Sequence, residues 1–226
     1  LNIFELVINS ENSEKITVTN DLVLQKVQKN TVLYDKTGEQ HYDIISAFIK
    51  SIRGSDPNAA VYWLARMVEG GEDVKFIARR MVILASEDIG NANPNALLLA
   101  NSTFQAVNTI GYPEARIILS QCATYLASSP KSNASYMAIK QAQQVVKQTG
   151  NLSVPLEIRN APTQLMKELN YGKGYQYAHD FEENFVDFEF LPEEISGTTF
   201  YKPGNNTREQ KFREFLEKKW KGKYGY

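Results

Sequence analysis

Apolar residues recur at helical spacing through most of the chain, separated by short polar or glycine-containing stretches. Between residues 40 and 150 each apolar run covers about four helical turns, and runs end at Gly54, Gly90 and Gly150. Positions three and four residues apart share one face of an α-helix, whereas a half-buried strand alternates. No alternation of useful length appears in this region. The pattern therefore predicts an all-α fold.

Local signals mark where individual helices begin. Asp56-Pro57 places a capping side chain before a proline at the first helical position, and Asn93-Pro94 repeats this arrangement. The links between the predicted helices are short, which favours antiparallel neighbours. We therefore expect a compact antiparallel helical array.

The stretch from Gly174 to Gly204 has a different character, because it is irregular and rich in aromatic residues. Each ring can bury a large apolar area, so we expect an ordered arm that packs over the helical array. Thr207–Gln210 resembles a capping box and predicts a final helix, with Trp220 on its apolar face.

The turn signal at residues 36–39 suggests a domain boundary nearby. We expect residues 1–34 to belong to a preceding domain, since they are too few to fold alone. Residues 35–226 are expected to form the helical domain, with the arm at about residues 174–226. The chain begins in a helical pattern without a methionine, so we expect a fragment of a longer protein.

Composition narrows the classes of function. A net charge of −1 argues against a protein devoted to coating nucleic acid, although a local basic face is compatible with it. The single Cys122 cannot form an intramolecular disulfide, suits a reducing compartment and is expected to be a buried thiol. No stretch reaches the roughly 20 apolar residues of a membrane helix.

Residues capable of catalysis are few and not arranged for it. His41, at a helix start, is expected at the surface. His179 and the neighbouring acids only weakly indicate a metal site, and we favour a solvated acidic loop there. Glu87 and Asp88 are expected to pair with arginines across a helix contact. No GxxxxGK[ST] phosphate loop occurs. We expect no catalytic residue, no cofactor and no metal site in this chain.

Several basic residues could form a DNA-backbone patch if they meet on one face. These candidates are Arg53, Arg79, Arg80, Lys131, Arg159 and Lys167. Each also has an ordinary explanation; Arg53, for example, lies near a helix end, where cations interact favourably with the helix dipole.

Ordered segments over nearly the whole chain resemble the replication-associated recombination protein A family. The matching segments are KSIRGSDPNAA at residues 50–60, ASEDIGNA at 85–92, PKSN at 130–133, RNAPT at 159–163 and YAHD at 177–180. This family, also called RarA or MgsA and with Werner-helicase-interacting relatives, consists of AAA+ ATPases similar to clamp loaders. Agreement of several separate motifs makes the resemblance specific.

The resemblance implies an amino-terminal ATPase core that holds ATP and Mg²⁺, a helical lid, and a helical, clamp-loader-collar-like region that forms a homotetramer. Residues 1–34 would be the end of the lid, and the sensor arginine would lie just before Leu1. The parent protein would be a cytoplasmic, nucleoid-associated, DNA-dependent ATPase. It would act at stalled replication forks with single-stranded DNA ends and single-strand-binding protein.

These considerations leave three hypotheses for the chain itself. The first is a homo-oligomerisation region without an ATPase site, whose interface includes Tyr175, Tyr177, Phe181, Phe185, Phe188 and Phe190. The second is a DNA-binding module that uses the basic residues named above. The third is a stand-alone helical enzyme. It has the least support, because no pair of titratable groups is visibly arranged for acid–base work.

Overall fold

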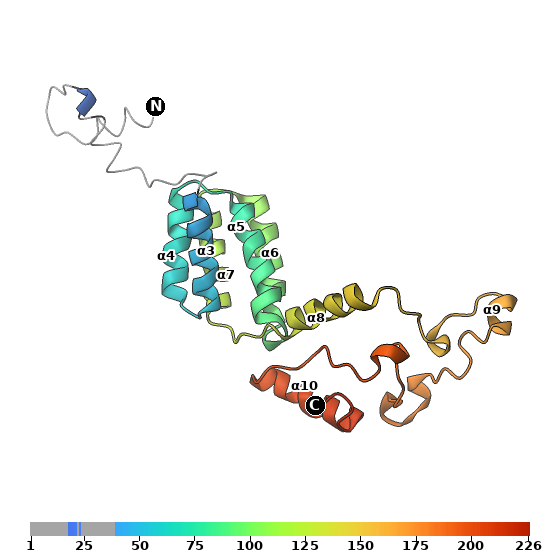
Figure 1. Cartoon of the computed structure of the whole chain (residues 1–226). Helices are drawn as coiled ribbons and strands as arrows, with labels where there is room; N and C mark the ends of the chain where they lie inside the picture. The colour runs from blue at the N-terminus through green and yellow to red at the C-terminus, as the bar shows by residue number, and fades with distance from the viewer. Residues whose placement is uncertain (1–17, 22, 24–38) are drawn as a thin grey trace. The chain divides into compact units, whose positions relative to one another are not determined.

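The structure, a computed structural model, describes residues 18–21, 23 and 39–226 (Figure 1). These residues are helical or irregular and contain no strand, so the predicted all-α array with an irregular arm and a final helix is confirmed. The described residues up to Met81, together with Ser102–Ser128, form one compact unit (unit 1). Val82–Asn101 and Ser129–Tyr226 form the other (unit 2). The predicted boundary at residues 34/35 lies outside the described residues.

Unit 1 is a helical array around a continuous apolar core. Its helices are α3 (Glu39–Arg53), α4 (Pro57–Glu69), most of α5 (Val74–Leu84), the second half of α6 (Asn95–Ile110) and α7 (Ala115–Ala127). The helices α3, α4 and α7 pack on one another (Figure 1). The largest fully buried side chains of this core are Phe48, Ile52, Met67, Ile77, Met81, Val107, Leu119 and Leu126.

The start of α4 follows the predicted capping arrangement. The Asp56 carboxylate accepts hydrogen bonds from the backbone amides of Asn58 and Ala59, both at 2.9 Å, and Pro57 is the first helical residue. These amides have no partner within the helix, so the side chain satisfies them. The helix ends at Gly70, the first residue of the pair Gly70-Gly71, and glycine is a common helix stop.

His41 departs from its predicted surface position, and the prediction was wrong. Only 9% of the residue is exposed, and its Nδ1 lies 2.7 Å from Oε2 of the equally buried Glu72. The ring also packs on Phe76, with 5.0 Å between ring centroids. A polar ring is buried here because a carboxylate from a distant part of the sequence supplies its partner.

Unit 2 combines long helices with short turns. After Leu84 the chain passes through a π-helical turn η1 (Ala85–Ile89) and a 3-10 turn η2 (Gly90–Ala92) into α6. The remaining elements are α8 (Ala134–Thr149), η3 (Leu156–Ile158), α9 (Gln164–Glu168), η4 (Ala178–Asp180), η5 (Glu182–Asn184), η6 (Glu193–Ile195) and α10 (Thr207–Trp220). None of the helices in the described residues is long and apolar enough to cross a membrane.

The cap of α10 begins one residue earlier than predicted. Asn206, not Thr207, is the N-cap: its Oδ1 accepts from the Glu209 amide at 3.0 Å, and its Nδ2 donates to Glu209 Oε2. Asparagine serves this role as well as threonine, and Glu209 occupies the third helical position that a capping box requires. The Glu209 side chain is completely buried.

Candidate interaction site

The motif at residues 85–92 fixes the position from which α8 projects. The Ser132 amide donates to the Asp88 carbonyl at 2.8 Å, and Asn91 Nδ2 donates to Ser135 Oγ at 3.2 Å and to Tyr201 Oη at 3.3 Å. Gly90 has φ +48°, and a Cβ there would lie 3.0 Å from the Ser132 carbonyl oxygen. Only glycine fits this close approach without strain. These motif residues therefore orient α8.

The helix α8 has a clear start and stop, but no face of it is fully buried. Asn133 precedes it, Gly150 ends it with φ +69°, and none of its residues is buried. Four of its large apolar side chains are 36–61% exposed, and these are Tyr136, Met137, Ile139 and Val146. Ile139 and Val146, seven residues apart, lie on the same side of the helix. Its charged residues are two lysines, Lys140 and Lys147.

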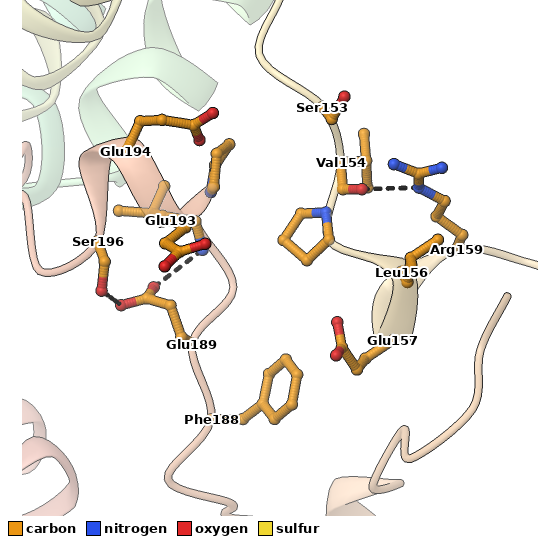
Figure 2. Close-up of a pocket in the computed structure, with 13 residues that line it drawn as sticks. Ser153, Val154, Leu156, Glu157, Arg159, Phe188, Glu189, Glu193, Glu194 and Ser196 are labelled. Atoms are coloured by element: carbon orange, nitrogen blue, oxygen red, sulfur yellow. Dashed lines mark hydrogen bonds between the residues drawn. The ribbon is translucent and has the colours of Figure 1, made fainter. Parts of the chain in front are cut away.

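A groove lies between residues 153–159 and 188–196, both in unit 2 (Figure 2). Its volume is about 660 Å³. The apolar residues that line it are Val154, Pro155, Leu156, Phe188, Leu191 and Pro192. Four glutamates also line the groove, and these are Glu157, Glu189, Glu193 and Glu194.

Glu189 is held within its own wall of the groove. Ser196 Oγ donates to Oε2 at 2.6 Å, and the Leu191 and Gly197 amides donate at 2.9 and 3.2 Å. Lys223 Nζ lies 3.6 Å from Oε2. Burial raises the pKa of Glu189, but these hydrogen bonds and the Lys223 charge outweigh it and leave the pKa below its ordinary value. Glu189 therefore closes the 189–197 loop.

The aromatic residues proposed for the interface divide into two groups. Tyr175, Tyr177, Phe181 and Phe190 are 42–55% exposed. Phe185 instead packs edge-on against Trp220 of α10, with 5.1 Å between centroids, and Phe188 packs against Phe190 at 5.3 Å. Two of the six rings thus help to fold the arm. The described contacts of this stretch join it to α10 and η2, and its packing on the array of unit 1 stays a prediction.

Charge also ties the arm to α10. The Glu183 carboxylate forms ion pairs with Lys218 and Lys219, and Lys219 additionally donates to the Glu183 carbonyl at 2.9 Å. Hydrogen bonds from these lysines lower the pKa of Glu183 to about 2. Two lysines near the carboxyl end, Lys218 and Lys219, therefore have their partner within the chain.

The six basic candidates are spread over both units. Arg53, Arg79 and Arg80 belong to unit 1, whereas Lys131, Arg159 and Lys167 belong to unit 2.

Two of the candidates in unit 2 have structural partners. Arg159 Nε donates to the Val154 carbonyl at 2.6 Å, and its guanidinium lies over the Tyr171 ring at 4.9 Å. Lys131 Nζ donates to the Ser129 carbonyl, and burial lowers the pKa of Lys131 while Asp88 opposes that effect. A single patch made by all six stays a prediction.

The sequence-based candidates did not include three cations that line hollows in unit 2, and these are Lys202, Arg208 and Lys211. Lys131 and Lys202 line one hollow beside the start of α8, and Arg208 and Lys211 line another beside the start of α10. No aspartate or glutamate lines either hollow. These three residues are far from Lys131 in the sequence, so no local pattern indicated that they lie in the same part of the structure.

Cys122 is fully buried, as predicted. Burial raises the pKa of the thiol to about 11, and the Thr103 hydrogen bond opposes this rise only in part. Within the described part of the chain no three His, Cys, Asp or Glu side chains gather in a way that could hold a metal ion.

Comparison with known protein families explains why the motifs recur together. The profile described as "MgsA AAA+ ATPase C terminal" matches residues 54–220, and that described as "AAA C-terminal domain" matches residues 1–53. Together with the all-α fold, these matches define the class as a carboxyl-terminal region of AAA+ ATPases. The chain belongs to the MgsA family, which confirms the resemblance found in the sequence.

Individual relatives agree with this assignment. The chain is 44% identical over 220 residues to Replication-associated recombination protein A of Coxiella burnetii, covering 96% of the chain and 50% of that protein. It is 40% identical over 207 residues to the protein of the same name in Escherichia coli K12, with 91% and 46% coverage. It is 42% identical over 191 residues to "ATPase WRNIP1" of Dictyostelium discoideum, with 81% and 22% coverage. The chain spans about half the length of the two bacterial relatives.

Proposed function

We propose that the chain is the homo-oligomerisation region of an ATPase that acts in replication-associated recombination, and that it assembles as a tetramer. The parent protein binds ATP and Mg²⁺ in a part of its sequence outside this chain, and the chain itself carries out no catalysis. In the parent, this region joins four ATPase cores that work at stalled replication forks in the cytoplasm. The names of the relatives and the family match support the recombination and ATPase roles.

The observation that carries the oligomerisation role is the uncovered apolar surface of unit 2. A helix of 16 residues that buries none of them gains little stability from packing in its own chain. Four large apolar side chains on α8 and four aromatic rings of the arm are more than one-third exposed. Exposed apolar side chains that gather on a surface mark protein–protein interfaces.

Replacing the two outward-facing apolar residues of α8 tests this role. We expect Ile139→Asp with Val146→Asp to dissociate the tetramer into smaller species in multi-angle light scattering, because two charges cannot be buried unpaired in an apolar interface. The matched control is Gln144→Asp with Gln148→Asp, which adds the same charge on the far side of the helix, given about 100° per residue. An unchanged tetramer in the apolar-to-Asp variant would contradict the assignment of α8 to the interface.

The interface role of the aromatic arm has its own test. Ending the chain after Gly174 removes the exposed rings at Tyr175, Tyr177, Phe181 and Phe190, and we expect the tetramer to be lost. If light scattering finds the oligomer intact, the aromatic stretch does not belong to the interface.

A second function, binding of single-stranded DNA, is favoured by the two cationic hollows. Lys202, Arg208 and Lys211 line these hollows together with Lys131, which also interacts with Asp88, and cations suit a phosphate backbone, which dominates the affinity of proteins for DNA. Of the sequence-based candidates, only Lys131 lines one of these two hollows, and Lys202, Arg208 and Lys211 are additional to that set. Single-strand-binding protein remains a proposed partner of the parent.

We expect Lys202→Ala, Arg208→Ala and Lys211→Ala together to weaken binding to a single-stranded oligonucleotide in fluorescence anisotropy. The slope of log affinity against log salt should fall by about 0.7 for each lost phosphate contact on a single strand. The control is the equally basic set Lys50→Ala, Lys75→Ala and Arg116→Ala in unit 1. The DNA-binding role is wrong if the unmodified chain fails to bind even at low salt.

A further inference from the structure

We infer that the groove between residues 153–159 and 188–196 receives α8 of a second copy of the chain. This inference rests on the proposed self-association and names the two surfaces that meet. The apolar stripe of the helix fills the groove, and the lysines beside the stripe face the carboxylates at the rim of the groove.

The groove is open and apolar along both walls. Val154 and Leu156 form part of one wall and are 53% and 42% exposed, and Phe188 lies on the other wall (Figure 2). Leu191 and Pro192 also line the groove. A volume of about 660 Å³ holds several large side chains. The groove therefore has room for several apolar side chains of a partner and apolar surface to bury.

The rim of the groove is negatively charged. Glu193 and Glu194 are exposed and form no ion pair within the described part of the chain, and Glu157 lies on the opposite wall. The one cation among the lining residues, Arg159, is turned toward the Val154 carbonyl and the Tyr171 ring. The groove therefore attracts an apolar partner that carries positive charge.

The helix α8 has the complementary chemistry. Its sequence, ASYMAIKQAQQVVKQT, contains Lys140 and Lys147 and no acidic residue. Each lysine directly follows an exposed apolar residue, Ile139 or Val146, so the charge lies beside the stripe. The two lysines are about 10 Å apart along the helix axis, from a rise of about 1.5 Å per residue. Complementary charges of this kind select and align partners at an interface.

The partner is a second copy because one chain leaves both surfaces uncovered. Ile139 and Val146 are 57% and 61% exposed while Val154 of the groove is 53% exposed, so the helix of a chain does not occupy its own groove. Two copies can exchange their helices reciprocally about a two-fold axis, and each contact then occurs twice. Such a pair buries the stripe and the groove of both copies.

Charge reversal on each side, followed by mixing, tests the pairing between copies. One variant carries Lys140→Glu and Lys147→Glu, and the other carries Glu193→Lys and Glu194→Lys. Each variant alone places like charges at the contact, and we expect its dissociation constant, measured by analytical ultracentrifugation, to rise at least about tenfold. In an equimolar mixture, both reciprocal contacts are again between opposite charges, and we expect mixed oligomers with nearly the original affinity.

The charge-reversal test needs a control with the same change of charge outside the proposed contact. The matched control is Asp43→Lys with Glu69→Lys, which makes the same charge change at exposed positions of unit 1, outside both proposed surfaces, and is expected to leave association unchanged. If the unmodified chain is a monomer, the proposed function fails together with the pairing. If it associates but the reversals have no effect, or mixing does not restore association, the pairing is wrong while the proposed oligomerisation stands.

Discussion

At the scale of single residues, a buried carboxylate organises the start of α10. Glu209 is fully buried, accepts a hydrogen bond from Tyr201 Oη at 3.2 Å and bonds reciprocally with Asn206. Tyr201 in turn accepts from Asn91, so one network connects η2, the arm and α10. Burial is the main reason that the pKa of Tyr201 is raised. The phenol stays protonated and able to donate.

Removing this carboxylate should destabilise unit 2. We expect Glu209→Ala to lower the free energy of unfolding by about 1–3 kcal/mol, because it leaves buried donors without an acceptor and removes one side of the cap. Urea unfolding followed by circular dichroism measures the change. The exposed Glu214→Ala on the same helix is the control, and equal stability of the two variants would contradict this role.

Residue-level predictions from sequence succeeded where the partner is close along the chain. The Asp56 cap and the Gly70 and Gly150 helix ends depend on neighbours within a few residues, so they could be read directly. His41 could not, because its environment is set by Glu72, 31 positions away. Nothing in the spacing of these two residues indicates that α3 and the link between α4 and α5 bury them together.

At the scale of elements, the ion pairs of Glu183 attach the arm to α10. The pKa of about 2 is below the ordinary 4.5 because the carboxylate is stabilised by Lys218 and Lys219. The contact therefore contributes fully above about pH 4.5 and is lost as the pH falls through about 2. We expect a side-chain carbon NMR titration of Glu183 to have its midpoint near that lower value.

The same titration in Lys218→Ala with Lys219→Ala provides the control. Its midpoint should return to about 4.5, the ordinary value for glutamate. A midpoint near 4.5 in the unmodified chain would show that the arm does not depend on these pairs.

The helix α8 shows what element-level reasoning from sequence can and cannot provide. Its start near Asn133, its end at Gly150 and its amphipathic pattern were all predictable. An apolar stripe indicates that a face will be buried, but not whether the covering surface lies in the same chain. The groove could not be predicted either, because its walls are irregular segments about 35 residues apart whose approach depends on tertiary structure.

At the scale of the whole molecule, the fold class and the family followed from sequence, whereas the functional surfaces required coordinates. Helical periodicity was sufficient to predict the fold class, and the ordered motifs were sufficient to predict the family. The predicted DNA-binding set mixes residues of two units, and three of the cations that gather in unit 2 were missed. Surface assignment depends on which residues other elements leave uncovered, and no local pattern encodes that.

The central claim is that this chain assembles with itself through apolar surface, and multi-angle light scattering over a range of concentrations tests it most directly. We predict a mass about four times the 25.6 kDa of one chain at both about 0.1 M and about 0.5 M salt, because apolar contacts are not screened by ions. A mass of 25.6 kDa at every concentration and at both salt levels would contradict the claim.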